Sequence, residues 1–445
     1  MNYGKNQPDR RPWVPSELEE TIAAGAARYA ALGAGELEAE LDDLLARHEQ
    51  YMDRECLNLY AGTNVMNPRA ARRLGHSVGT RPSLGYPGDK YEMGMHHAEQ
   101  LEIMAMALIR EIFACRHAEI RVGSGSLANL YAFMACTRPG DRIMAFSDAA
   151  AGHVTHHAAG AAGLYGLEIH DVPFDGARMT IDLDALAIRV RDLQPRLIVV
   201  AGSMCLFPYP VAELRRIADE VGAYVMYDAA HMSGLIAGGE FQQPLAEGAH
   251  LMTTSTYKSF GGPPSGLVLT DDAGLAERLD AIAFPGLTAN FDLGRTAALI
   301  LAALDLREHG VPYAKACIAN AQALATALAD EGCPVHGVEG RGFTESHHVA
   351  IRAAAFGGGT RACRRLEQAN ILASGIGLPL PPVEGDFNAI RLGTQEITRF
   401  GMTPQEMPLV ARLFAEVLLE RRPPEQVKPE VIDLRRRFQR LHFVR

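Results

Sequence analysis

The chain has 445 residues, of which 48% are apolar, and a formal net charge of −10 at pH 7. This length is sufficient for two domains with buried cores, and the negative charge argues against nucleic acid as the main partner. No run of about 18 uninterrupted apolar residues occurs, so we expect no membrane span. The first residues contain no apolar signal core, which favours a cytoplasmic location, and none of the cysteines forms a Cys-x-x-Cys pair, which is typical of reduced thiols.

Helical and strand patterns alternate along most of the chain. A polar, proline-bearing arm comes first, and two helical patterns follow it at 16–32 and 35–52. Further on we expect helices at 97–113 and 127–136 and strands at 142–147, 167–172, 196–202, 224–228 and 265–270. Such alternation predicts a mostly parallel sheet with helices on both faces.

A second unit is expected after a helix near 296–306. It has helical patterns at 314–331 and 404–420 and strands near 347–351 and 389–392. We therefore predict three parts: an N-terminal arm with helices (1–75), a large domain (76–310) and a small C-terminal domain (311–445).

Two apolar runs end in side chains that suit one cofactor. One run, 251–258, ends at Lys258, and another ends at Asp228, thirty residues earlier. Parallel strands deliver such residues to the carboxyl edge of a sheet, where ligands bind. A buried lysine can form a Schiff base with an aldehyde, and a carboxylate can hold a pyridinium proton, so the pair is typical of enzymes that use pyridoxal 5′-phosphate (PLP).

A short turn of small residues is a candidate phosphate site. Ser124, Gly125 and Ser126 precede an apolar helix. Small residues let backbone N–H groups approach a phosphate, and the N-terminus of a helix adds favourable partial charge. The turn therefore predicts the place of the cofactor's phosphate.

Other polar residues suggest a substrate rather than a metal. His153, His156 and His157 have no carboxylate or cysteine ligand at suitable spacing, so we expect no metal site. Arg391 is our choice for the substrate's α-carboxylate, because a guanidinium grips a carboxylate through two parallel hydrogen bonds.

Seven segments resemble the serine hydroxymethyltransferase family in their order and spacing. They are 85–91, 123–129, 152–156, 217–224, 228–235, 253–262 and 390–399. The resemblance implies an α/β protein with the aspartate-aminotransferase-like fold (fold type I) of PLP-dependent transferases. This fold has a mostly parallel central sheet in a large domain and a smaller α+β C-terminal domain.

The same resemblance implies roles for matching residues. Lys258 is the Schiff-base lysine, Asp228 pairs with the protonated ring nitrogen, and His153 stacks on the ring. The further cofactor contacts implied are Ser124, Gly125, Ser126, Ser203, His231, Ser255 and Gly262.

The chain departs from the family where folate chemistry is concerned. In the family segment Tyr-Ala-Glu-Gly-Tyr-Pro-Gly, this chain has Pro82 for the first tyrosine and Leu84 for the glutamate. That glutamate transfers a proton in folate-dependent chemistry, and leucine can neither donate nor accept one. The family's tyrosine pair is here Tyr91-Glu92. We expect Tyr91 to act in catalysis and substrate binding, and Glu92 either to supply a displaced catalytic carboxylate or to face solvent.

Three more departures lie elsewhere. Gly62 replaces a family serine, Tyr257 replaces the histidine before the lysine, and 379–388 differs from the usual folate-contacting loop. The altered positions are those linked to tetrahydrofolate, so we doubt that folate is a cofactor here.

The expected function is PLP-dependent cleavage or formation of the Cα–Cβ bond of a threonine- or serine-like β-hydroxy amino acid, through a glycine quinonoid and without folate. The partners would be this amino acid and a small aldehyde. Two alternatives stay open: a glycine hydroxymethyltransferase that uses tetrahydrofolate, with Glu92 or water replacing the missing acid, and another fold type I reaction such as transamination. The resemblance also implies a homodimer or a dimer of dimers, with 86–91 and Gly261–Gly262 contributing to the site of the other subunit.

Overall fold

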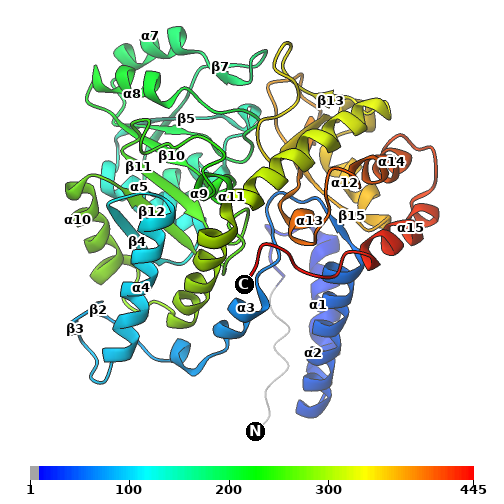
Figure 1. The fold of residues 1–445 in the computed structure, drawn as a ribbon, viewed down its shortest axis with the longest axis horizontal. Helices are drawn as coiled ribbons and strands as arrows, with labels where there is room; N and C mark the ends of the chain where they lie inside the picture. Colours follow the sequence, from blue (N-terminus) through cyan, green and yellow to red (C-terminus); the bar gives the residue numbers. More distant parts are fainter. Residues whose placement is uncertain (1–9) are drawn as a thin grey trace. The chain divides into compact units, whose positions relative to one another are not determined.

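The computed structural model describes residues 10–445, and the chain divides into two compact units, Met1–Glu55 and Cys56–Arg445 (Figure 1). The described part of the first unit contains α1 (Ser16–Ala30), α2 (Ala34–Glu49) and a short π-helix, Gln50–Glu55. None of the residues in these helices is buried. Among the helices of residues 10–445, none is long and apolar enough to cross a membrane.

A seven-stranded sheet forms the centre of the second unit. Its strand order is β4 (His117–Val122), β12 (Gly266–Thr270), β11 (Leu251–Ser255), β10 (Tyr224–Asp228), β9 (Leu197–Val200), β5 (Arg142–Ala145) and β6 (Glu168–Asp171). Neighbouring strands are parallel from β11 to β6, whereas β12 is antiparallel to both β11 and β4. The predicted mostly parallel sheet is therefore confirmed.

A four-stranded antiparallel sheet lies further along the chain. Its order is β13 (Val335–His336), β14 (His348–Arg352), β17 (Ala389–Gly393) and β16 (Ser374–Ile376). Three strand pairs complete the pairing: β1 (Leu57–Asn58) with β15 (Ile371–Leu372), β2 (Gly85–Tyr86) with β3 (Asp89–Lys90), and β7 (Phe174–Asp175) with β8 (Thr180–Ile181).

The α-helices of the second unit are α3 (Pro68–Leu74), α4 (His96–Ile112), α5 (Gly125–Cys136), α6 (Ala161–Leu164), α7 (Leu183–Leu193), α8 (Val211–Asp219), α9 (Ser233–Ala237), α10 (Ala273–Ala281), α11 (Leu293–Asp330), α12 (Gly359–Gln368), α13 (Gln395–Arg399), α14 (Met407–Leu418) and α15 (Pro424–Arg436). Short 3-10 and π turns are η2 (Ser77–Thr80), η3 (Asp148–Ala150), η4 (Val154–His156), η5 (Ile282–Leu287) and η6 (Ala354–Phe356).

Helices cover both faces of the large sheet. Buried residues of α5 and α10 pack on one face, and those of α4, α7, α8, α9 and α11 pack on the other. Because both faces are buried, the central strands are apolar throughout, as in Leu197-Ile-Val-Val200, where every residue is buried. A separate core lies beneath the small sheet, between α12, α14, α15 and the end of α11.

The two helical patterns expected at 296–306 and 314–331 are one helix. α11 is continuous from Leu293 to Asp330, with Pro312 inside it (Figure 1). Proline usually ends a helix. Here apolar residues are buried on both sides of Pro312, against α4 on one side and α14 on the other, and this packing holds the helix together. The division into large and small domains at 310/311 stays a prediction, and α11 runs across that point.

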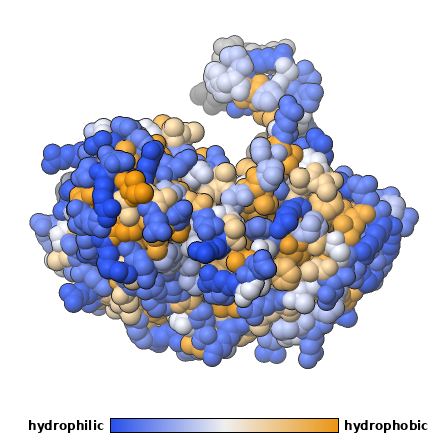
Figure 2. Space-filling view, turned by 90° about the horizontal axis from the view of Figure 1, so that it is seen from above, coloured by the Kyte–Doolittle hydropathy of each residue, from blue (hydrophilic) through white to orange (hydrophobic). Residues whose placement is uncertain are grey.

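Hydrophilic residues dominate the surface, and apolar residues form separate patches on the face seen in Figure 2. Large apolar side chains are exposed at Tyr91 (81%) and Met93 (88%), in the segment before α4. Ile103 and Met104, on α4 itself, are about half as exposed, at 43% and 48%.

Candidate active site

A cavity of about 500 Å³ lies beyond the carboxyl ends of the central strands. It is lined by five of the residues predicted from sequence, Lys258, His153, Ser203, His231 and Arg391. Tyr60, Gly62, Thr63, Tyr257, Phe387 and residues 375–377 also line it. The structure thus brings together residues that are up to 331 positions apart in the chain, from Tyr60 to Arg391.

Lys258 follows β11 and is only 7% exposed. Burial lowers its pKa from the ordinary value for lysine to about 8, with Arg391 acting in the same direction and Asp228 opposing it. A pKa near 8 makes a substantial fraction of the amine neutral at physiological pH, and the neutral amine is the nucleophile.

His231 connects Lys258 to Arg391. Its Nδ1 is 3.1 Å from the carbonyl oxygen of Ala61, so Nδ1 carries the hydrogen and donates it. Nε2 therefore accepts from Lys258 Nζ at 3.1 Å and from Arg391 Nη1 at 3.2 Å. Burial and these two cations hold the pKa of His231 well below its usual range, so the ring is neutral.

Arg391 comes from β17 of the small sheet and is 6% exposed. It donates to the carbonyl oxygen of Ser203, and its Nε and Nη2 donate to Ser374 Oγ at 3.3 and 3.2 Å. Burial lowers its pKa to about 10, so it stays charged at neutral pH. No carboxylate is among these partners, which leaves the guanidinium suited to an anionic ligand.

Asp228 ends β10 and is held by residues to which the sequence analysis gave no role. His156 Nε2 and the Asn129 side-chain amide each donate to Asp228 Oδ2 at 3.0 Å, and the N–H of Ala230 donates to Oδ1 at 3.0 Å. Burial alone would raise the pKa of Asp228, but the hydrogen bond and charge of His156 outweigh it and hold this pKa well below the usual range. The carboxylate is therefore ionised and ready to pair with a cationic N–H group.

His156 and Asn129 lie within two segments that resemble the family, 152–156 and 123–129, so the signal was present in the chain. The sequence did not show that these two side chains, His156 from η4 and Asn129 from α5, bind the same carboxylate.

His153 is fixed by Thr155. The backbone N–H of Thr155 lies 3.3 Å from His153 Nδ1 and its hydroxyl lies 2.7 Å from the same atom. Since Nδ1 accepts these contacts, the hydrogen of the neutral ring is on Nε2. Burial lowers the pKa of His153 to about 4, so the ring is a flat, uncharged surface on the cavity wall.

The turn before α5 has the features of a phosphate site. Ser124 is the N-cap, and its hydroxyl accepts from the N–H of Leu127 at 3.1 Å. The first N–H groups of the helix, those of Gly125 and Ser126, have no partner within the helix and so suit an anion. A Cβ atom on Gly125 would lie 3.0 Å from Cβ of Ser255, which explains why glycine and serine face each other here.

Ser255 itself is 1% exposed, and its hydroxyl donates to the carbonyl oxygen of Ala230 at 3.2 Å. These four residues, Ser124, Gly125, Ser126 and Ser255, are outside the lining of the cavity described above. Asn129, one turn further along helix α5, connects this turn to Asp228 through its hydrogen bond to the carboxylate.

Side chains that donate hydrogen bonds to its backbone carbonyl groups hold the loop after Lys258 in place. Asn64 Nδ2 donates to the carbonyl of Lys258 at 3.0 Å, and Tyr313 Oη donates to the carbonyl of Ser259 at 2.9 Å. The fully buried Arg399 donates to the carbonyls of Gly261 at 3.2 Å and Val65 at 2.9 Å.

Gly261 has φ +71°, and a Cβ atom there would lie 2.4 Å from Cζ of Arg399. Gly262, predicted as a cofactor contact, is buried next to it, and its N–H donates to the carbonyl of Thr256 at 2.6 Å. These contacts hold the backbone of the loop after Lys258 in place, and with it the position of Lys258 in the cavity.

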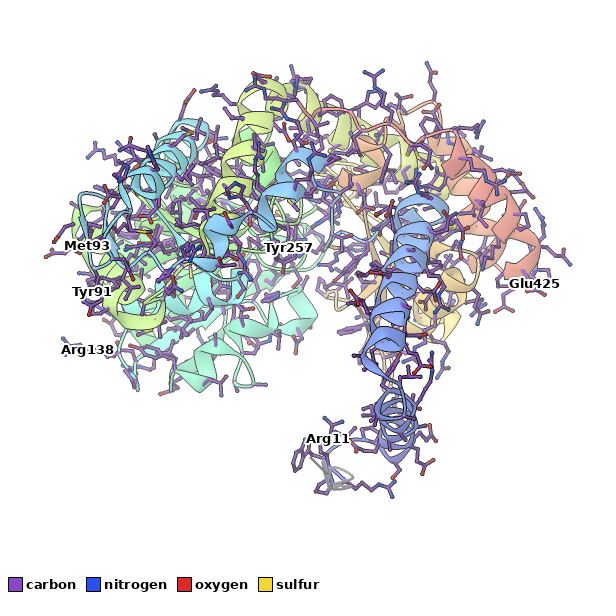
Figure 3. The ribbon with its side chains drawn as sticks, turned by 90° about the horizontal axis from the view of Figure 1, so that it is seen from below. Arg11, Tyr91, Met93, Arg138, Tyr257 and Glu425 are labelled. Carbon is purple, nitrogen blue, oxygen red and sulfur yellow. The ribbon has the colours of Figure 1, made fainter. Side chains whose placement is uncertain are left out.

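Tyr91 and Glu92, which were predicted to act in catalysis, are also outside the lining of this cavity within one chain. Tyr91 is exposed and lies with Met93 at the periphery, away from Tyr257, which is next to Lys258 (Figure 3). Glu92 accepts a hydrogen bond from the backbone N–H of Leu84 at 3.0 Å, so its carboxylate is bound to its own segment.

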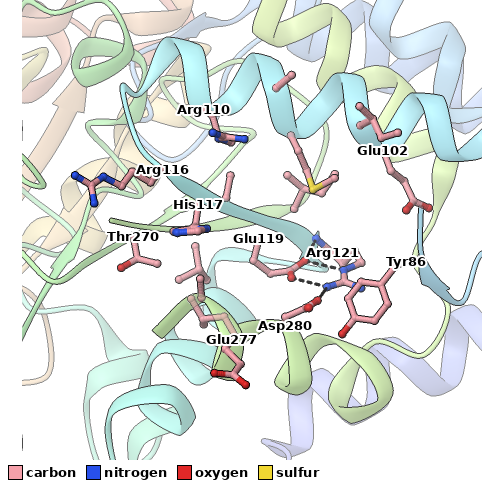
Figure 4. A pocket seen from close by; sticks show the side chains of 18 of the residues that line it. Tyr86, Glu102, Arg110, Arg116, His117, Glu119, Arg121, Thr270, Glu277 and Asp280 are labelled. Carbon is pink, nitrogen blue, oxygen red and sulfur yellow. Dashed lines mark hydrogen bonds and ion pairs between the residues drawn. The ribbon is translucent and has the colours of Figure 1, made fainter. Parts of the chain in front are cut away.

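A second cavity, of about 510 Å³, lies between α4, β4 and α10 (Figure 4). Its polar groups are largely paired with one another: Arg121 binds Glu119 at 2.7 Å and also contacts Asp280. A hydrogen bond from Tyr86 to Asp280 raises the pKa of that tyrosine. This cavity lacks an amine or a carboxylate placed like those of the Lys258 site, so we assign it no chemistry.

The Lys258 site fits PLP. It offers a buried amine with a lowered pKa for the aldehyde, an ionised buried carboxylate for the ring nitrogen, a flat neutral histidine and a helix N-terminus with small residues for the phosphate. For the residues that the structure describes, no group of three or more histidine, cysteine or acidic side chains is arranged to hold a metal ion.

Comparison with known proteins identifies the family of the chain. The family model for serine hydroxymethyltransferase matches residues 35–414. An α-methylserine aldolase of a Ralstonia species is 49% identical over 435 residues, which cover 98% of this chain and 99% of the relative. A serine hydroxymethyltransferase of Methanopyrus kandleri is 41% identical over 399 residues, 89% of this chain and 92% of the relative.

Among solved structures, the L-threonine transaldolase of Pseudomonas fluorescens has a TM-score of 0.83 and 25% identity, over 95% of this chain and 96% of that one. The expected fold type I architecture is thereby confirmed. Membership of the family implies PLP as the cofactor. The chain belongs to the serine hydroxymethyltransferase family of PLP-dependent enzymes.

Proposed function

We propose that this enzyme cleaves the Cα–Cβ bond of a β-hydroxy-α-methyl amino acid such as α-methylserine, without folate, and releases formaldehyde and alanine. The atoms balance, because the hydroxymethyl group leaves as formaldehyde and its proton replaces it on Cα. The reverse reaction joins the two products.

The observation that carries this proposal is the replacement of the family's proton-transferring glutamate by Leu84. Within one chain, Glu92, the carboxylate that the sequence suggested as its replacement, accepts a hydrogen bond from the backbone N–H of Leu84 at 3.0 Å. The α-methylserine aldolase relative, at 49% identity, also resembles the chain more than the serine hydroxymethyltransferase relative, at 41%.

The described side chains have the chemistry that this reaction needs. When bound, the cofactor would draw electrons from the substrate's Cα. Asp228 would hold a proton on the ring nitrogen, and Lys258 is the amine that would hold the aldehyde carbon. Arg391 would bind the α-carboxylate, and His231 would keep Lys258 and Arg391 oriented through its neutral Nε2.

The test is direct. The purified protein is incubated with α-methylserine, L-threonine or L-serine, each with and without tetrahydrofolate, and free aldehyde and the product amino acid are measured. We expect formaldehyde and alanine from α-methylserine in the absence of folate. Cleavage that occurs only with tetrahydrofolate would contradict the proposal.

A second candidate, a folate-dependent glycine hydroxymethyltransferase, is favoured by the family model and by the relative from Methanopyrus kandleri. The substitution Leu84→Glu distinguishes the two, because it restores a group that can move a proton. If folate-dependent turnover of serine appears only in this variant, position 84 accounts for the missing activity. The matched control is Leu84→Gln, which has a similar size and no acid.

We also propose a homodimer in which the segment around Tyr91 reaches the other subunit's site. Support comes from the exposure of Tyr91 and Met93, which are 81% and 88% exposed in one chain. Light scattering coupled to size-exclusion chromatography measures the state, and a monomer that retains full activity would exclude this arrangement.

A further inference from the structure

Tyr60 lines the same cavity as Lys258 and Arg391. Its backbone is held from both sides: its N–H donates to Asn58 Oδ1 at 3.0 Å, and its carbonyl accepts from Gln395 Nε2 at 2.9 Å. Gln395 comes two residues after β17, the strand that carries Arg391. Tyr60 and Arg391 are therefore fixed relative to each other before any ligand binds.

The ring of Tyr60 rests over Gly62. A Cβ atom at position 62 would lie 2.6 Å from both Cζ and Oη of Tyr60, far closer than side chains pack. The family's serine could not stand at this position with the ring in place. The glycine at 62 and the tyrosine at 60 therefore depend on each other, because the tyrosine ring occupies the space that a side chain at 62 would need.

Arg391 also lies close to this ring, with its Cζ 5.8 Å from the ring centroid. A carboxylate has about four acceptor sites, and a guanidinium that binds it through two parallel bonds leaves some of them free. The Tyr60 hydroxyl, in the same cavity wall, is a donor of the right kind for such a site. Its closeness to the guanidinium is also reflected in the pKa of Arg391, which burial lowers and Tyr60 raises.

We propose that Tyr60 is a substrate-contacting residue that binds the α-carboxylate together with Arg391, in the space that Gly62 leaves open. This inference rests on the function proposed above and adds the residue that orients the substrate. With the carboxylate held at two points, the α-methyl and hydroxymethyl groups take set positions against the cavity wall.

The test measures binding of 2-methylalanine to the PLP-loaded protein by the change in cofactor absorbance. This ligand has the α-carboxylate and the α-methyl group but no hydroxyl group, so its Cα–Cβ bond is not cleaved. Tyr60→Phe keeps the ring over Gly62 and removes only the O–H donor, and we expect it to weaken binding by about tenfold. Binding of isopropylamine, which lacks the carboxylate, should stay within about twofold, because the change acts only on the carboxylate contact.

Unchanged affinity of Tyr60→Phe for 2-methylalanine, or an equal loss for isopropylamine, would overturn the proposal. So would failure of the unsubstituted protein to bind 2-methylalanine. Thermal unfolding of each variant shows whether the fold is intact.

A second pair of variants tests the arrangement itself. Gly62→Ser should displace the ring and weaken binding of 2-methylalanine, whereas in a Tyr60→Ala background the serine has room and should cause little further loss. Additive losses would count against the proposal. Since 2-methylalanine is not cleaved, these results stand whether or not the protein releases formaldehyde from α-methylserine, and absence of that release would overturn the proposed function alone.

Discussion

If Lys258 is the amine that binds the aldehyde of the cofactor, its protonation should control cofactor uptake. Its pKa in the folded chain is about 8, below the pKa of an exposed lysine, because burial disfavours the charged form. We expect the rate of PLP uptake by the apoprotein, followed by absorbance, to rise with pH through a midpoint near 8. The unfolded chain binds more protons than the folded one between this pKa and that of a free lysine, so Lys258 also makes the free energy of unfolding rise with pH in that range.

Asp228→Asn gives the control for this prediction. The carboxylate of Asp228 raises the pKa of Lys258, so its removal should move the midpoint of uptake to lower pH. A midpoint that stays in place, or moves to higher pH, would show that another group limits the uptake.

His156 binds Asp228, the carboxylate predicted to hold the ring nitrogen of the cofactor. In His156→Leu the carboxylate loses a hydrogen bond and its electrostatic contact with His156, both of which lower its pKa, so the pKa of Asp228 should rise toward the value that burial favours. A change of one unit in the pKa of Asp228 corresponds to about a tenfold change in the equilibrium between its two protonation states. We therefore expect kcat to fall by about tenfold while KM changes little. His157→Leu is the matched control, because His157 contacts the carbonyl of Phe146 at 2.8 Å instead of Asp228. Equal kinetic losses in the two variants would mean that the effect is structural.

At the scale of elements, the loop after β11 depends on backbone geometry. Gly261→Ala puts a Cβ atom 2.4 Å from Cζ of the buried Arg399, at a φ of +71°. We expect the free energy of unfolding to fall by about 3 kcal/mol and PLP to bind more weakly, because the carbonyls that Arg399 holds would move. Urea unfolding and a PLP titration measure the two effects.

Gly140→Ala separates the cost of the backbone angle from the collision. Gly140 also has a positive φ, +89°, but a Cβ atom there meets nothing within 4 Å. Its substitution should cost about 1 kcal/mol and leave PLP binding unchanged. If both variants lose the same stability and the same cofactor affinity, the Arg399 contact has no special role.

The elements themselves were predicted unevenly. The strands that became β5, β6, β9, β10 and β12 and the helices α4 and α5 were expected from apolar runs and periodicity, and they are confirmed. The antiparallel direction of β12 was not expected, because an apolar run such as Gly266–Thr270 gives no indication of the direction in which a strand pairs. The edge strand β4 was also missed, since charged and polar residues interrupt His117–Val122.

In the dimer proposed above, each site is shared between the two subunits. Lys258→Ala and Tyr91→Ala should each be inactive as pure dimers. In a mixture, about half of the dimers would be mixed and each would contain one intact site, so about a quarter of the native activity should return. Activity is measured after dissociation and reassociation of the two proteins.

Lys258→Ala mixed with Asp228→Asn is the control, because Asp228 acts on Lys258 within the same chain, so no mixed dimer restores a site. If the Tyr91 mixture recovers no more activity than this control, each site is built by one chain, and Tyr91 has no role across the interface.

The chain's own residue order determined the class of fold and predicted the cofactor lysine and the carboxylate for the ring nitrogen, because strand ends and short motifs are local properties. Folding in three dimensions decided the rest. Arg391 reaches His231 from a different sheet, 160 residues away, His156 and Asn129 converge on Asp228, and Tyr60 covers Gly62. Local periodicity carries no information on such contacts, since they depend on how separate elements pack against one another.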